Sequence, residues 1–369
     1  DAHLIYPAAK TLFHMIAAAI AGAALLVSMA LWRLSTGPIS LAFLAPYVEE
    51  ALSAEDASYR VTFDELRLTW AGWERSVDVR ARHVQSFSTD GALLITVPEM
   101  AVELSIAAML RGVIAPTKLE LFAADLHVAH NANGLLAVDA NEASRTSSNF
   151  NLLDVIKHAL ETPRSDHRLS YLQSVHIAQG NFVVYDFDLK PSWEAKKVNV
   201  TIEQSKNELS AELDLEVELD ESTVKLAVTA LFSRENSLIN ADFKFSSLKP
   251  KELSHVTSIL GPLERIDLPL NGRVTVVADL QLEVHETTFE IMGGPGSVSL
   301  QGVFPGASSL NISSFRAQGI FNPNPQTLTL EEVFIDTDGT IINANGLING
   351  EWSHPAIEAD IAVEHLPVS

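Results

Sequence analysis

The chain has 369 residues, a formal net charge of −22 and no cysteine. The acidity argues against nucleic acid and against an anionic lipid surface as partners, because Lys and Arg are needed to neutralise phosphate. The lack of cysteine excludes disulfides and thiolate metal sites.

An apolar run without formal charge extends from Thr11 to Trp32 and is flanked by Lys10 and Arg33. Its roughly 22 residues suffice for a helix to cross a bilayer core of about 30 Å. A cleaved signal peptide is the alternative, because 28–30 resembles a cleavage site, although signal peptides usually have shorter apolar regions. We predict an N-terminal tail over 1–10 and a retained transmembrane helix over 11–34.

Apolar residues recur at helical spacing between Gly37 and Ala54. We predict an amphipathic helix at the entrance of the following sheet, within 35–56, with its regular part beginning near Pro46. It could cap the end of a sheet or lie on the membrane surface at the mouth of a groove.

Strand patterns dominate the rest of the chain, and they slip at two points, near Asp64 and near Ala124, where we expect β-bulges. A helix is expected at 250–260, and Asp338-Gly339 and Asn349-Gly350 are hairpin signals. The expected segments are a first β-groove segment over 57–139, a loop and short helix over 140–168, and further β-groove segments over 169–369, truncated at the C-terminus.

The clearest alternation lies between Ser210 and Phe232, where apolar and acidic residues alternate, a short Glu-Ser-Thr segment follows, and a second alternating run begins. Successive side chains of a strand point to opposite faces, so this pattern predicts an antiparallel hairpin with one apolar and one hydrated face. The residues that we assign to the apolar face, as a candidate lining for an apolar ligand, are Leu213, Leu215, Val217, Leu219, Val224, Leu226, Val228, Ala230, Ile239, Ala241, Phe243 and Phe245, with Met100, Val102, Leu104 and Ile106 near the membrane end.

About twenty strands and only three short helices outside the anchor leave much apolar surface to cover. Large exposed apolar patches are rare in soluble proteins unless they bind something. The strands could form sandwiches, closed barrels, or one long sheet curled into an open trough, on the order of 100 Å long if continuous. We expect a mostly β fold, with a long, twisted, mostly antiparallel sheet curled into an open groove after the transmembrane helix.

Catalytic motifs are not recognisable. The glycine-rich run 293–296 precedes no helix and no Lys-Ser/Thr pair, and the Asp336–Gly339 segment lacks the spacing of a calcium loop. We therefore expect no enzymatic activity, no cofactor and no metal.

Several motifs together resemble the AsmA-like envelope proteins, and among them the YhdP-type branch of the bridge-like lipid-transfer superfamily. They are GPISLAFLAPYVEEAL at 37–52, YRVTFDELRLTW at 59–70, VPEMAVELSIAAMLRG at 97–112, PTKLEL at 116–121, SSLKPKEL at 246–253 and IDLPLNG at 266–272. Each motif is weak alone, but their order after the apolar run spans nearly the whole chain.

The resemblance implies an N-terminal fragment of a longer protein with a single-pass anchor in a bacterial inner membrane and its bulk in the periplasm. It implies a groove that carries phospholipid acyl chains toward the outer membrane, and no catalytic residues. Two alternatives stay open: a scaffold or assembly factor for outer-membrane proteins, and a purely structural protein with an anchor and a sandwich.

Overall fold

The structure is a computed structural model. It describes residues 37–53, 59–69, 78–88, 91, 93–109, 111–131, 134–138, 147–151, 171–186, 192–219, 222–254, 258–281, 283–301, 309–350 and 355–365, with 21, 22, 25, 28, 29, 32 and 33. The tail at 1–10, most of the predicted anchor at 11–34 and the short helix predicted within 140–168 lie outside these residues. In the part of the chain that the structure describes, no helix has the length and apolar character needed to cross a membrane.

Strands make up most of the described chain. In the N-terminal half they are β1 (Ile39–Ser40), β2 (Tyr59–Thr62), β3 (Glu65–Thr69), β4 (Asp78–Ser88), β5 (Leu93–Leu104), β6 (Pro116–Phe122), β7 (Asp125–Asn131), β8 (Gly134–Val138), β9 (Ser147–Asn151) and β10 (Ser174–Asp186). They continue as β11 (Ser192–Gln204), β12 (Glu208–Glu218), β13 (Thr223–Ser233), β14 (Leu238–Leu248), β15 (Ile266–Asp267), β16 (Leu270–Asp279), β17 (Val284–Gly293), β18 (Gly296–Ser299), β19 (Ser309–Ile312), β20 (Ser314–Pro323), β21 (Gln326–Thr337), β22 (Thr340–Asn349) and β23 (Ala356–Glu364).

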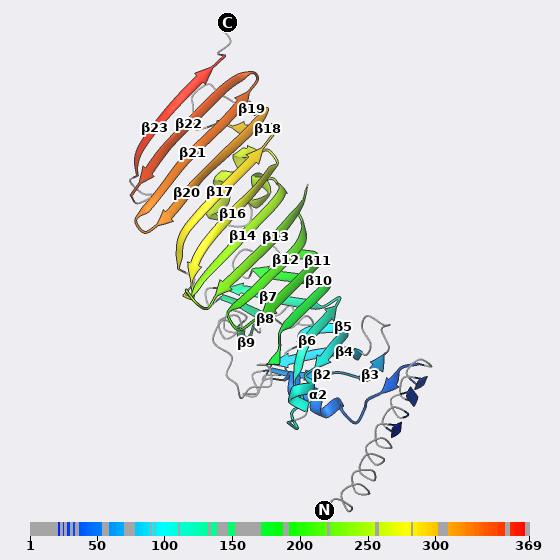
Figure 1. Cartoon of the computed structure of the whole chain (residues 1–369). Helices are drawn as coiled ribbons and strands as arrows, with labels where there is room; N and C mark the ends of the chain where they lie inside the picture. Colours follow the sequence, from blue (N-terminus) through cyan, green and yellow to red (C-terminus); the bar gives the residue numbers. More distant parts are fainter. Residues whose placement is uncertain are drawn as a thin grey trace, which may run out of the picture.

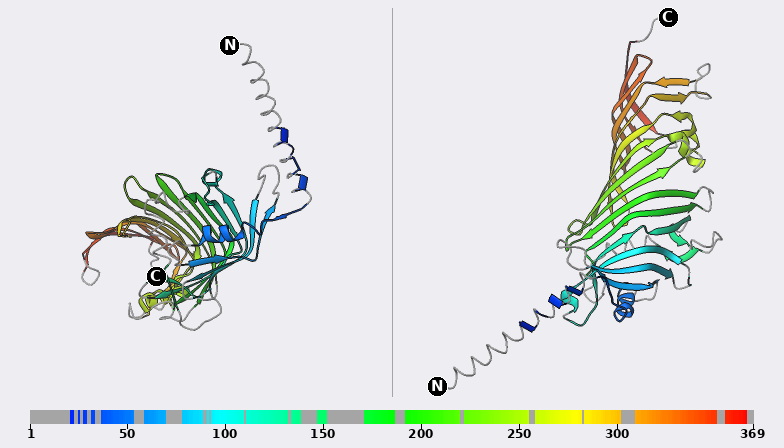
Figure 2. Two further views of the ribbon diagram at one scale, coloured as in Figure 1. Left: turned by 90° about the horizontal axis from the view of Figure 1, so that it is seen from below. Right: turned by 90° about the vertical axis from the view of Figure 1, so that its right-hand side faces the viewer.

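Twenty of these strands form one sheet, and β15, β18 and β19 form a small second one. The pairings run from β1 through β3, β4 and β5 to β6 and β7, and then through β10, β11, β12, β13, β14, β16, β17, β20, β21 and β22 to β23. Every pairing along this path is antiparallel except those of β10 with β6 and β7. The sheet twists along its length, with β1 and β23 toward opposite ends (Figure 1), and seen along that length the strands follow an open arc (Figure 2). The prediction of one long, mostly antiparallel sheet is confirmed.

Two of the three predicted hairpins are observed, and most of the connection after the third signal, Asn349-Gly350, lies outside the described residues. β12 and β13 form the expected hairpin, in which Leu215 lies opposite Leu226. Asp338 and Gly339 both have positive φ, at 47° and 88°, between the opposed residues Thr337 and Thr340. Two successive positive φ values match the turn whose twist fits a two-residue hairpin, which explains the Asp-Gly sequence.

Helix α2 (Ala45–Leu52) covers the apolar face at the β1 end of the sheet. Its N-terminal turn contains Pro46, and Val48, Ala51 and Leu52 are buried. The Ser53 backbone N–H and hydroxyl both donate to the Glu49 carbonyl, and the hydroxyl accepts from the Val61 N–H of β2 at 2.9 Å. The helix occupies only 45–52 of the predicted range 35–56.

The α2 helix completes a closed hydrophobic core. This α2 core contains Leu41, Val48, Leu52, Leu66, Ala81, Val84, Val97, Met100, Val102 and Ala124. Each fully buried aliphatic side chain of this kind stabilises the fold by roughly 1.5–3 kcal/mol. The β1 end is therefore an ordinary two-layer core.

One predicted helix and one predicted strand position need correction. The helix expected at 250–260 is a single turn, α5 (Pro250–Leu253), followed by the 3₁₀-helix η2 (Ser258–Arg265). The α5 helix ends where the Ser254 hydroxyl donates to the Lys251 carbonyl at 2.6 Å, because this side chain competes for a helical acceptor. Ile106, which we assigned to the apolar face with Met100, Val102 and Leu104, is not part of a strand: β5 ends at Leu104, and Ile106 begins the one-turn helix α3 (Ile106–Met109).

Candidate functional site

The long sheet aligns apolar residues across its strands. We call a line of directly opposed residues on successive strands a rung, because its members share one face of the sheet. Rung A consists of Leu66, Ala81, Met100, Leu121, Ile177, Val200, Leu213, Val228, Phe243, Val274, Phe289, Gly319, Leu330, Gly346 and Ala359. Every member is apolar or glycine.

A second line of the same kind, rung B, lies two residues away on the same face. It consists of Leu68, Val79, Val102, Leu119, Val175, Ile202, Ala211, Ala230, Ala241, Val276, Thr287, Phe321, Leu328, Ile348 and Ile357. Thr287 is its one polar member, and neither apolar rung contains a charged residue.

The residues between rungs A and B form rung C on the opposite face, because adjacent side chains of a strand alternate. Rung C consists of Arg67, Arg80, Ala101, Glu120, His176, Thr201, Glu212, Thr229, Asp242, Thr275, Thr288, Ile320, Thr329, Leu347 and Glu358. Charged and polar side chains predominate here, so the two faces differ in character along the whole path.

The cover over the apolar face changes along the sheet. In the α2 core, Met100 of rung A is 4% exposed and Val102 of rung B is 1% exposed. From β12 to β22 the members of both rungs are half-buried, apart from the buried Gly319, and at the edge strand β23 Ile357 is 63% exposed. Half-burial is what neighbours within one sheet provide, so these side chains lack the second layer that α2 supplies.

Most of the residues predicted to line an apolar surface share this one face. Leu213 and Val228 belong to rung A, and Ala230 to rung B. The register also places the following on this face: Leu215, Val217, Val224, Leu226, Ile239, Ala241, Phe243 and Phe245. Leu219 follows the last residue of β12 and its backbone N–H donates to the Ser222 carbonyl, so it belongs to the turn.

The four residues predicted near the membrane end differ from these. Met100 and Val102 are core residues beneath α2, and Leu104 packs against the same core while partly buried. The side chain of Ile106 lies outside the described residues. Packing of this closed core therefore separates Met100 and Val102 from any ligand on the apolar face.

Sequence reasoning missed the apolar rungs beyond β14, of which Val274, Phe289 and Leu330 are examples. Their alternation is visible in the sequence, but apolar residues such as Val277 and Ile320 on the opposite face obscure it. A bulge at Glu331 also shifts the parity within β21, because Gln318 lies opposite Glu332 while Gly319 lies opposite Leu330.

Aromatic rings fill the space beside glycines on the apolar face. A Cβ on Gly272 would lie 2.5 Å from the ring of Phe245, the residue opposite on β14, and a Cβ on Gly319 would lie 2.9 Å from the ring of Phe289. A phenylalanine that lies over a cross-strand glycine is a recognised stabilising pair. The apolar face therefore supplies part of its own packing without a second layer.

The opposite face is organised by cross-strand ion pairs. The Lys197 ammonium lies 3.1 Å from the Glu216 carboxylate, and the Lys196 ammonium 3.0 Å from that of Glu218. The hydrogen bond and charge of Lys197 hold the pKa of Glu216 below its ordinary value, and the hydrogen bond that Lys196 donates to the Glu218 carboxylate raises the pKa of Lys196. These exposed pairs keep charge in water, which identifies this face as the hydrated one.

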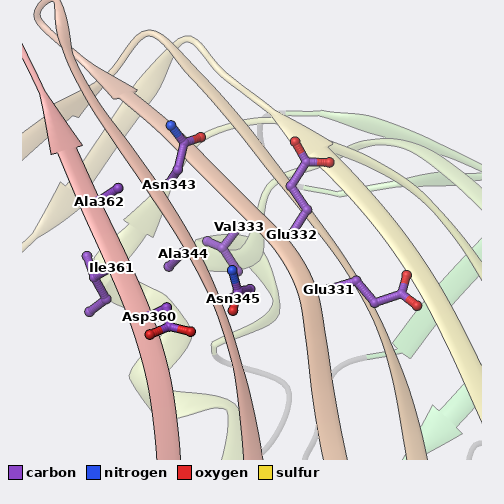
Figure 3. Close-up of a pocket in the computed structure, with 9 residues that line it drawn as sticks. All are labelled: Glu331, Glu332, Val333, Asn343, Ala344, Asn345, Asp360, Ile361 and Ala362. Atoms are coloured by element: carbon purple, nitrogen blue, oxygen red, sulfur yellow. The ribbon is translucent and has the colours of Figure 1, made fainter.

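A depression of about 310 Å³ lies over β21, β22 and β23 (Figure 3). Its lining includes three carboxylates, those of Glu331, Glu332 and Asp360, and two amides, those of Asn343 and Asn345. Figure 3 shows that the carboxylates of Glu331 and Glu332 point apart and do not converge on Asp360. In the described part of the chain, no group of three or more acidic or histidine side chains is placed to hold a metal ion.

Comparisons of the chain with protein-family models, with curated proteins and with solved structures find no match. The site is therefore characterised by its geometry: an uncharged apolar face, covered by a helix at one end and half-buried along most of its length.

Proposed function

We propose that the protein is a non-enzymatic lipid-transfer protein and that its apolar face accommodates the acyl chains of phospholipids. The observation that carries the proposal is rung A, which crosses fifteen strands without a polar residue. Fourteen strand spacings of about 4.8 Å give rung A a length of roughly 67 Å, and the part beyond the buried α2 core members Leu66, Ala81 and Met100 spans eleven spacings, or roughly 53 Å.

The energetics of such a path suit a mobile ligand. Each methylene of an acyl chain that leaves water contributes about 0.8 kcal/mol, wherever along the path it is buried. A surface of nearly uniform apolarity thus holds acyl chains firmly without fixing them at one position. A single charge on the path costs free energy to desolvate and creates a barrier.

The sheet follows an open arc (Figure 2), and in this proposal the apolar face lines the inside of the groove while the ion-paired face lies in water. Lipid headgroups would remain in water at the open side of the groove. In this proposal the transmembrane anchor over 11–34 lies in a bacterial inner membrane, the sheet lies in the periplasm, and lipids pass toward the outer membrane. The membrane, the compartment and the direction of transfer in this proposal rest on the resemblance to AsmA-like proteins.

Val228 and Thr229 offer a matched test, because they are neighbours on β13 and belong to rungs A and C. The same change, Val228→Asp or Thr229→Asp, places a carboxylate on the apolar or on the hydrated face. We expect Val228→Asp to abolish transfer of a fluorescent phospholipid between donor and acceptor vesicles, and Thr229→Asp to leave it near wild type. Mass spectrometry of the purified proteins should find phospholipid in the wild type.

Far-ultraviolet circular dichroism would verify that both variants keep their strands. Equal transfer by the two variants would contradict the proposal, as would a wild-type protein without co-purifying lipid. Capture of unfolded outer-membrane polypeptide by a lipid-free protein would instead support the assembly-factor alternative.

A further inference from the structure

Helix α2 has apolar residues on two sides. One side packs into the α2 core through Val48, Ala51 and Leu52. On the other side the aromatic side chains of Phe43, just before the helix, and Tyr47 are 71% and 57% exposed. Packing in the α2 core explains why the first three positions are apolar. It does not explain why the two exposed positions are aromatic.

A third exposed apolar side chain belongs to α3, a one-turn helix whose flanking segments pack against the α2 core. Met109 of α3 is 48% exposed, and α3 lies between Leu104 and Ile114, both of which pack against the α2 core. Among the described residues, six of the twelve large hydrophobic side chains with high exposure precede residue 110: Leu25, Met29, Trp32, Phe43, Tyr47 and Met109. Three of the six, Leu25, Met29 and Trp32, belong to the N-terminal apolar segment, and the other three, Phe43, Tyr47 and Met109, lie at the β1 end of the sheet.

Both charged residues of α2 follow its aromatic start. The Glu49 carboxylate is directed toward β2, where it accepts a hydrogen bond from the Phe63 N–H at 3.2 Å. Glu50 is exposed near the end of the helix, whereas Phe43 and Tyr47 lie around its start. The aromatic end of α2 therefore carries no charged residue of the helix.

A bilayer interface fits these residues better than water does. Tyrosine combines an apolar ring with a polar hydroxyl, and such side chains favour the boundary between acyl chains and headgroups. Only ten residues separate Phe43 from Trp32, which ends the uncharged apolar run of the sequence. The net charge of −22 opposes an anionic surface, so a zwitterionic lipid is the compatible partner.

We propose that Phe43, Tyr47 and Met109 form a contact with the interface of a zwitterionic phospholipid bilayer. The contact sets the β1 end of rungs A and B against the membrane, so α2 acts both as the cover of its core and as a membrane-seating element. The purpose of this membrane contact rests on the proposed lipid transfer. The contact itself can be tested independently of lipid transfer.

The absence of native cysteine allows single labels. Phe43→Cys, Tyr47→Cys and Met109→Cys would each be labelled with an environment-sensitive nitrobenzoxadiazole group in the full chain, reconstituted into phosphatidylcholine vesicles. Asn236→Cys, at the exposed turn between β13 and β14, is the distant control. We expect a blue shift and quenching by phosphatidylcholine brominated near the headgroup end of its chains at all three sites, and neither at 236.

Quenching at 43, 47 and 109 no greater than at 236 would overturn the inference. Burial of these labels without bromine quenching would do the same and would indicate a protein contact. A label at Val228→Cys separates the two proposals: quenching at 228 but not at 43 leaves lipid transfer standing, and the reverse leaves the membrane contact standing.

Discussion

The two ends of the same sheet solve the problem of an apolar face differently. At the β1 end, α2 covers rungs A and B and makes a closed core, in which Val102 is 1% exposed. From β12 onward the same rungs continue with the same residue types, yet Val228 and its neighbours stay half-buried. Residue type therefore does not distinguish structural core from candidate binding surface in this molecule; the cover does.

The difference has an energetic meaning. Side chains of the α2 core gain most of their transfer free energy on folding, so they stabilise the sheet. The members of rungs A and B from β12 to β22, apart from Gly319, are only half-buried, so a ligand that covers them would gain free energy by burying the rest of their apolar surface. The β1 end thus stabilises the fold, whereas the apolar face from β12 to β22 keeps the capacity to bind an apolar ligand.

The largest expected effect comes from placing the same charge in both regions. Val102→Asp buries a carboxylate in a closed core, which costs several kcal/mol and approaches the whole stability of a domain. Val228→Asp leaves the carboxylate in contact with water, and we expect a loss of about 1–2 kcal/mol. Urea unfolding monitored by circular dichroism measures both, and equal losses would mean that the two regions are covered alike.

A smaller effect is expected from the glycines beside the aromatic rings. Gly319→Ala sets a Cβ against the Thr329 carbonyl and the Phe289 ring, and overpacking of this kind costs roughly 1–3 kcal/mol. Gly261→Ala is the matched control, because nothing lies within 4 Å of its Cβ. If Gly319→Ala proved as stable as Gly261→Ala in thermal unfolding, the open region would be packed more loosely than described.

The smallest expected effect concerns the ion pairs of the hydrated face. Because the folded-state pKa of Glu216 is lowered by Lys197, its contribution to stability is present above the ordinary glutamate pKa and disappears as the pH falls through the lowered value. Glu216→Gln should therefore lose slightly less stability on acidification than wild type. Glu235→Gln, at an exposed turn, controls for the change in net charge; the same pH dependence in both variants would argue against a role for the pair.

Local alternation made the central hairpins predictable. The strands around Leu215, Leu226 and Phe245 were correctly assigned to one face because period-two patterns and turn residues are both local properties. The bulge expected near Ala124 corresponds to the break between β6 and β7, where Ala123 has a φ of 53°.

Non-local features were not predictable in this way. The parallel pairing of β10 with β6 and β7 joins strands whose paired residues are more than fifty positions apart in the sequence. No local pattern encodes the register of this pairing. The sequence likewise marks Met100 as apolar but does not show that it is buried in one core with residues of α2. Periodicity identifies an apolar face, whereas its cover depends on tertiary contacts.

The most direct test of the account is photo-crosslinking in cells at Leu226 and Glu216. Leu226 lies on the apolar face, two residues from Val228, and Glu216 lies on the hydrated face of the adjacent strand. A photoreactive residue at Leu226 should capture phospholipid, and one at Glu216 should not. Equal capture at the two positions, or none at either, would contradict the claim that the apolar face carries lipid.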